Sequence, residues 1–166
     1  MATSTVEQSA LRAEVSDTHL LDQTVEEVFA TMLGSSVTHS ESSLAPSNVP
    51  ITLTAVIGLA GALSGAFTLV VNEATAKRIA SNMLGIEATE LDGDVFDAVG
   101  EITNILAGAW KSRIVPLHSG CLLTVPTVVT GTSYDVHRKT TNFRMARSYI
   151  FADTPITINI FGEWPK

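Results

Sequence analysis

The chain has 166 residues, 45% of them hydrophobic and only 16% charged, which suits one folded domain with a substantial core and excludes wholesale disorder. The net charge of -7 argues against nucleic-acid binding, which needs a basic surface to meet phosphate groups. The only cysteine, Cys121, excludes an internal disulfide, and its apolar neighbours favour a buried thiol over a reactive one. We expect a cytoplasmic protein, because the first residues also lack the pattern of a secretory signal.

The first residues of the chain are polar, and we expect residues 1–17 to form a flexible tail ahead of a single domain at 18–166. Apolar residues recur at helical spacing from Thr18 to Leu33, and Gly34 is a natural stop, which predicts a helix there. The following segment, 35–50, is rich in Ser and Pro and predicts a loop or a frayed edge strand.

The segment 51–71 carries no charge and is long enough to span a bilayer. Glycines cluster at its centre, threonines interrupt it, and no basic cluster flanks it, as would be typical of a membrane helix. We therefore predict two buried strands, at about 51–59 and 63–71, joined by a glycine-rich turn, and no membrane association.

The second half of the chain alternates helical and strand patterns. A helix is predicted at 72–85, with Asn72 as its N-cap and Gly85 just beyond its end, and a long helix at about 92–113. A strand with one proline is predicted at 121–131, a polar turn near 133–141, and a closing hairpin around residues 153–155. Together these elements predict an α+β fold, an antiparallel sheet backed by helices.

The long helix places two polar residues side by side on its outer face. At about 100° per residue, Glu101 and Asn104 fall near Asp97, opposite an apolar stripe that contains Val99 and Leu106. Glu and Asn three residues apart on a solvated helix are common, so the spacing alone does not establish a function.

Small residues surround this pair, and they favour a site that something approaches closely. Gly100 and Gly108 lie within the helix, where a glycine costs about 1 kcal/mol relative to alanine. The same small residues could instead serve packing against a neighbouring helix, and both alternatives stay open at this point.

These residues resemble the signature of the CheX/CheC/FliY family of chemotaxis phosphatases. The family pattern has Asp or Ser, then Glu, Asn and a more distant Pro, and here these positions are Asp97, Glu101, Asn104 and Pro126. The likeness extends from about residue 18 to 163 and includes the strand–strand–helix segment that reads IGLAGALSGAFTLVV and then ATAKRIASNMLG. A single Glu-x-x-Asn motif and the short chain are similar to the CheX branch, which implies the CheC-like fold.

The resemblance implies that the chain removes phosphate from a CheY-like response regulator in chemotaxis or another two-component pathway. Asn104 would insert into the phosphorylated receiver domain and position the attacking water, and Glu101 would anchor on the regulator's lysine. Asp97, Gly100 and Gly108 would contact the partner. The chain would need no cofactor of its own, because the regulator supplies Mg²⁺, and the resemblance also implies a homodimer that pairs through the strands at 145–162.

Two alternatives to an enzyme remain at this stage. The chain could be a non-catalytic module of the same fold that binds a response regulator, or a structural homodimeric scaffold. The four histidines show no metal-ligand spacing, so no metal site is expected. We expect Lys111 and Arg113 to balance the dipole of the long helix, and Arg144, Arg147 and Lys139 to lie on a solvated face.

Overall fold

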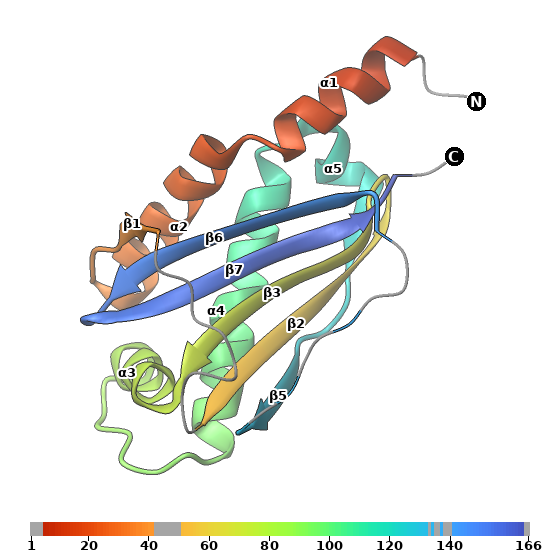
Figure 1. The fold of residues 1–166 in the computed structure, drawn as a ribbon. Helices are drawn as coiled ribbons and strands as arrows, with labels where there is room; N and C mark the ends of the chain where they lie inside the picture. Colours follow the sequence, from red (N-terminus) through yellow and green to blue (C-terminus); the bar gives the residue numbers. More distant parts are fainter. Residues whose placement is uncertain (1–4, 42–50, 133, 135–136, 138–140, 165–166) are drawn as a thin grey trace.

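The computed structural model describes residues 5–41, 51–132, 134, 137 and 141–164 (Figure 1). Five helices and seven strands occur in this part of the chain. In chain order they are α1 (Thr5–Val15), α2 (Thr18–Leu33), β1 (Thr38–Ser40), β2 (Thr52–Gly61), β3 (Ser64–Asn72), α3 (Glu73–Leu84), α4 (Gly93–Ser112), α5 (Val115–Gly120), β4 (Cys121–Leu123), β5 (Thr127–Gly131), β6 (Phe143–Phe151) and β7 (Thr154–Glu163).

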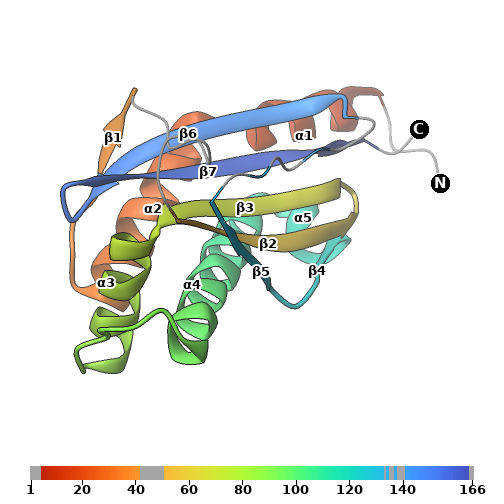
Figure 2. The same ribbon diagram turned by 60° about the horizontal axis from the view of Figure 1, so that its bottom comes forward.

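The strands form one antiparallel sheet in the order β1-β6-β7-β3-β2-β4, with β5 also paired to β2. Helices α2, α3 and α4 lie together on one face of this sheet (Figure 2). The α+β class predicted from the sequence, an antiparallel sheet backed by helices, is therefore confirmed.

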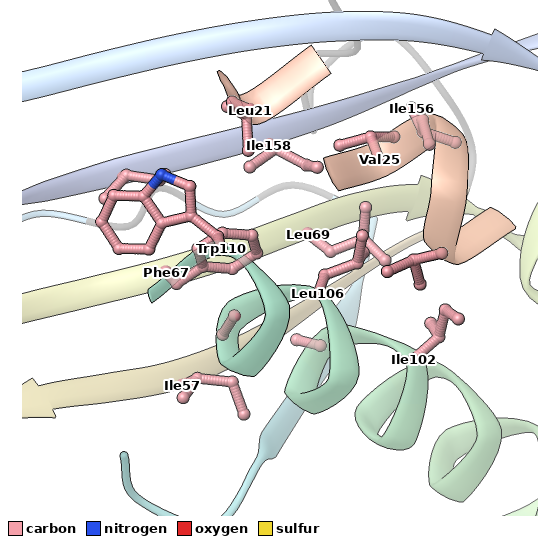
Figure 3. Packing of buried hydrophobic residues seen from close by; sticks show 14 of the residues in the cluster. Leu21, Val25, Ile57, Phe67, Leu69, Ile102, Leu106, Trp110, Ile156 and Ile158 are labelled. Atoms are coloured by element: carbon pink, nitrogen blue, oxygen red, sulfur yellow. The ribbon is translucent and has the colours of Figure 1, made fainter. Parts of the chain in front are cut away.

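The core lies between this helical layer and the sheet (Figure 3). Ile102 and Leu106 of α4 are fully buried. Alternate residues of the strands that face this helix are fully buried as well, because alternate side chains of a strand point to the same face of the sheet. Trp110 packs against Phe67 with a distance of 6.0 Å between ring centroids. Helix α4 is therefore the central helix, and its buried side is fixed by the sheet.

The predicted helix boundaries are confirmed where local capping signals set them. Asp17 accepts a hydrogen bond from the His19 backbone at 2.9 Å at the start of α2, and Gly34 ends this helix at a φ of 61°. Asn72 accepts a hydrogen bond from the Thr75 backbone at 2.8 Å to begin α3. Such caps satisfy the free amide groups of a first turn and are local in sequence, so the residue pattern predicts them.

The uncharged segment 51–71 forms the antiparallel pair β2 and β3, as predicted. Both strands are buried over most of their length, which explains why the segment alternates so little between apolar and polar residues. Among the helices that the structure describes, none is long and apolar enough to cross a membrane.

The predicted tail at 1–17 is wrong for residues 5–15, which form helix α1. Leu11 and Val15 lie four residues apart on one face of this helix and are buried in the core. The Arg12 guanidinium of α1 lies 5.7 Å from the centroid of the Trp164 ring, which follows β7. Only Leu11 and Val15 of α1 are buried, and the apolar residues of this mostly polar segment gave too weak a pattern to predict the helix.

The predicted strand at 121–131 is two short strands, β4 and β5, which pair with different parts of β2. The interruption falls at residues 124–126, where Pro126 has no amide hydrogen to donate to a strand ladder. Helix α5, which precedes β4, was not predicted. The polar turn expected near 133–141 lies largely outside the described residues.

The closing hairpin is confirmed as β6 and β7, joined at Ala152 and Asp153, whose φ angles are 50° and 64°. Of the strands at 145–162, through which we expected a homodimer to pair, β7 has no free edge, because it pairs with β6 on one side and β3 on the other. Strand β6 also pairs with β1 through residues 148–150. The homodimer itself stays a prediction.

Arg147 does not lie on a solvated face, in contrast to the exposed Arg144. Its guanidinium forms two hydrogen bonds to the Asp22 carboxylate on α2, at 3.1 and 2.5 Å, and the Tyr149 hydroxyl donates a third at 2.7 Å. Burial raises the pKa of Asp22, but these hydrogen bonds outweigh it and hold the pKa below its usual value. This cluster, Asp22–Arg147–Tyr149, joins α2 to the sheet. Lys139 lies outside the described residues.

Candidate active site on helix α4

Helix α4 begins with a side-chain cap and an acidic first turn. Asp92 accepts a hydrogen bond from the Val95 backbone at 3.2 Å, and Asp94 adds negative charge near the positive end of the helix dipole. The buried face of the helix then sets which residues point away from the sheet. Its buried residues are Val95, Ala98, Val99, Gly100, Ile102, Thr103, Leu106, Ala107 and Trp110.

Glu101 and Asn104 lie on the opposite side of α4, as the sequence pattern predicts. Glu101 is exposed, Asn104 is half-buried, and Asp97 is exposed one turn before them. In the part of the chain that the structure describes, no hydrogen bond or ion pair joins the Glu101 or Asn104 side chain to another residue. Both groups are therefore available to another molecule.

A hollow of about 410 Å³ lies beside this pair, between α4 and β5. Glu101 and Asp97 are on one side of it and Pro126 is on the other. Asn104 lies one helical turn beyond Glu101, next to the hollow and not in its lining. The remaining lining residues are Phe96, Gly100 and Val128.

The two glycines in the interior of α4, Gly100 and Gly108, differ in their surroundings. A Cβ atom at Gly100 would lie 3.3 Å from the Pro126 side chain and 3.6 Å from Val128, so the small residue here serves packing within the chain. A Cβ atom at Gly108 would meet no atom within 4 Å. The helix surface at Gly108 is therefore open, whereas Gly100 affects the exterior of α4 only through the shape of the hollow.

Pro126, Val128 and Phe96 were not predicted as site residues from their own positions in the sequence. The one available signal was the proline that follows the Glu-x-x-Asn motif in the family pattern, and the structure places it against Gly100. Phe96 and Val128 gave no signal, because an apolar residue on a helix or strand most often belongs to the core.

The basic residues near the end of α4 have roles within the fold. The Lys111 ammonium donates hydrogen bonds to the backbone oxygens of Leu117 and His118, at 3.2 and 2.5 Å, near the end of α5. Arg113 forms an ion pair with Glu27 of α2. These groups hold neighbouring helices together and do not extend the outer face that carries Glu101 and Asn104.

Among the described residues, neither a metal site nor a reactive thiol competes with this pair. The described residues contain no group of three His, Cys, Asp or Glu side chains that could hold a metal ion. Cys121 is buried, and this burial raises the pKa of its thiol, which disfavours the reactive thiolate. A larger hollow of about 810 Å³ lies between α2 and α3, but its Lys77 is already paired with Glu73 at 2.6 Å.

The fold is that of CheC-like proteins. A chemotaxis protein CheX from Vibrio vulnificus is similar with a TM-score of 0.74 at 23% identity, over 87% of this chain and 95% of that one. A CheC-like superfamily protein from Shewanella sp. PV-4 has a TM-score of 0.74 at 20% identity, over 88% and 96% of the two chains. The CheX of a CheX–CheY–BeF3–Mg²⁺ complex from Borrelia burgdorferi has a TM-score of 0.69 at 18% identity, over 87% and 96%.

The sequence defines the family more closely. Residues 53–146 match the model of the chemotaxis phosphatase CheX family, and the chain belongs to this family. The CheY-P phosphatase CheX of Thermotoga maritima is 32% identical over 95 residues, which are 57% of this chain. The match spans 61% of the length of that relative. The residues that match the family model include Glu101, Asn104 and Pro126.

Proposed function

We propose that this protein is a phosphatase that hydrolyses the aspartyl phosphate of a CheY-like receiver domain. The observation that carries this proposal is the outward pair on α4, Glu101 and Asn104, both unpartnered among the described residues and next to an open hollow. The family match supports it, as do the relative named as a CheY-P phosphatase and the solved complex of a relative with CheY.

Asn104 provides the catalytic contribution of this chain. An acyl phosphate is already activated, and the Mg²⁺ and lysine of the receiver domain neutralise its charge, so the missing element is a water in line with phosphorus. The Asn104 amide accepts a hydrogen bond from this water and orients it. Water then attacks phosphorus and the bond to the aspartyl oxygen breaks. Inorganic phosphate leaves with the protons of the water, and the aspartate of the receiver domain is regenerated as a free carboxylate. A neutral amide suits this position, because a carboxylate would repel the phosphate oxygens.

Glu101, one helical turn before Asn104, anchors the partner. Its carboxylate is exposed and free within the described chain, so it can meet the lysine of the receiver domain without first losing a partner. The rigid helix then fixes how far Asn104 reaches into the phosphorylated site. Anchoring by Glu101 and positioning of water by Asn104 require both side chains on one face of α4, and both lie on its outer face.

The proposal is tested by phosphate release from a phosphorylated receiver domain, with and without this protein. We expect the native chain to accelerate release and Asn104→Ala to lose about a hundredfold of that acceleration at saturating partner, as on removal of one positioned polar group in other enzymes. The half-buried side chain has no partner among the described residues, so the melting temperature should stay close to that of the native protein. A native chain that binds the receiver and leaves its rate of phosphate loss unchanged would instead be a binding module.

A further inference from the structure

Three residues between β4 and β5, Thr124–Pro126, form a bulge at the edge of the sheet. Strand β4 pairs with residues 59–61 of β2, and β5 pairs with residues 52–56. The bulge therefore lies opposite the middle of β2, where neither short strand continues the ladder. Bulges are common beside active sites, where they direct a side chain away from the sheet.

Thr124 fixes the bulge to β2 through Gly58. The Thr124 amide donates to the Gly58 oxygen at 3.0 Å, and the Gly58 amide donates to the Thr124 hydroxyl oxygen at 2.8 Å. The Thr124 hydroxyl donates in turn to the Val125 oxygen at 3.0 Å. A Cβ atom at Gly58 would lie 2.8 Å from the Thr124 methyl group, so a glycine is required for this contact. The bulge is therefore held in one position.

The bulge reaches from the sheet to the face of α4 that carries the site. Pro126 packs against Gly100 and lines the hollow opposite Glu101. Val125, the residue before it, is 82% exposed, so none of the described residues covers its apolar side chain. Val125 does not line the hollow itself, but it directly precedes Pro126, which does. A molecule that covers Glu101 and Pro126 therefore comes close to the exposed bulge.

The negative charge of residues 86–110, which include most of α4, indicates the kind of surface that can dock on this helix. Residues 86–110 contain six acidic residues and no lysine or arginine. Asp94, Asp97 and Glu101 among them are exposed on α4. A partner that approaches this face must bring positive charge to meet the helix and an apolar group to meet the bulge.

We propose that the Thr124–Pro126 bulge is a docking element for the receiver domain, in which Val125 packs on an apolar surface next to the phosphorylated site. The inference rests on the proposed function for the identity of the partner. Its argument is that Pro126 and Glu101 line one hollow, so the surface that meets Glu101 also covers the bulge. In this arrangement Val125 contributes affinity, and Asn104 contributes the chemical step.

The test compares Val125→Asp with a matched control, Val6→Asp. Val6 is 78% exposed and lies on α1, outside the hollow and its walls, so it differs from Val125 in position and hardly in exposure. The readouts are the Kd for a receiver domain activated with Mg²⁺ and beryllofluoride, which stands in for the phosphoryl group, and the kcat and KM of phosphate release. We expect Val125→Asp to raise Kd and KM about tenfold with kcat within about twofold of the native value, and Val6→Asp to change none of them.

A second variant, Val125→Thr, keeps the shape of the side chain and adds one polar atom, so it preserves the fold if the charged variant does not. We expect it to weaken binding by about threefold. Native affinity in both folded Val125 variants would overturn the docking role, even if Asn104→Ala abolished turnover. Conversely, weaker binding of the Val125 variants by a chain without phosphatase activity would support the docking role and reject the proposed function.

Discussion

Two polar clusters on neighbouring helices differ in whether their side chains have hydrogen-bond partners within the described chain. In the Asp22–Arg147–Tyr149 cluster, the Asp22 carboxylate accepts three hydrogen bonds from the sheet. On α4, the Glu101 and Asn104 side chains have no such partner among the described residues. The first cluster stabilises the chain, and the second is left available for another molecule. A change in the Asp22–Arg147–Tyr149 cluster should therefore lower stability. A change at Glu101 or Asn104 should instead lower activity and leave stability nearly unchanged.

The largest effect on stability is expected for Asp22→Ala. The Arg147 guanidinium would keep its partly buried position without its carboxylate partner, at a cost of about 2–3 kcal/mol. The matched control is Glu27→Ala, which breaks the exposed ion pair to Arg113 and should cost less than about 1 kcal/mol. Urea unfolding measures both. Equal losses in the two variants would show that the Asp22 cluster has no special role in stability.

The same cluster predicts a pH dependence. The pKa of Asp22 is lowered in the folded state, so its stabilising contribution is complete above the unfolded pKa of about 3.9 and is lost as the pH falls toward the folded value. The stability difference between the native chain and Asp22→Ala should therefore shrink in acid below about pH 4. A difference that stays constant down to acid unfolding would contradict this assignment.

A smaller, purely functional effect is expected for Glu101→Gln. The change removes the charge and keeps the shape, so KM should rise about tenfold and depend less on salt, while the melting temperature stays constant. Asp97→Asn is the matched control, since Asp97 lines the same hollow one turn earlier, and it should change KM by less than about threefold. A fall in kcat without any change in KM would reject the anchoring role of Glu101.

The smallest effect is expected for Gly108→Ala, and it should separate stability from activity. A methyl group there meets no atom within 4 Å, so the chain should gain about 1 kcal/mol from better helix propensity. If a partner closes on this surface, kcat/KM should fall about threefold at the same time. Gly93→Ala adds a methyl group in open space at the start of α4, so it should leave kcat/KM unchanged. Unchanged kcat/KM in Gly108→Ala would remove Gly108 from the contact surface.

Local patterns in the sequence predicted much of this architecture. The end of α2 at Gly34, the caps of α3 and the orientation of α4 depend on residues within a few positions of each other, so spacing alone specifies them. The outward placement of Glu101 and Asn104 followed from the same periodicity. Their chemical roles did not follow from it and came from the family resemblance.

Contacts between segments far apart in the chain could not be predicted from the sequence pattern. Asp22 and Arg147 are 125 residues apart, and nothing near either residue indicates that they meet. The same applies to Gly58 and Thr124, whose hydrogen bonds hold the bulge beside α4. The wall of the hollow opposite Glu101 is therefore a product of tertiary packing, which explains why the spacing of residues in the sequence did not predict it.

The most direct test of the central claim is the structure of this protein in complex with its receiver domain, activated with Mg²⁺ and beryllofluoride. We expect the outer face of α4 to meet the receiver, with the Asn104 amide within about 3.5 Å of a water or fluoride at the phosphorylated aspartate and the Glu101 carboxylate on a lysine. An interface on another face of the molecule, with Asn104 in solvent, would contradict the account.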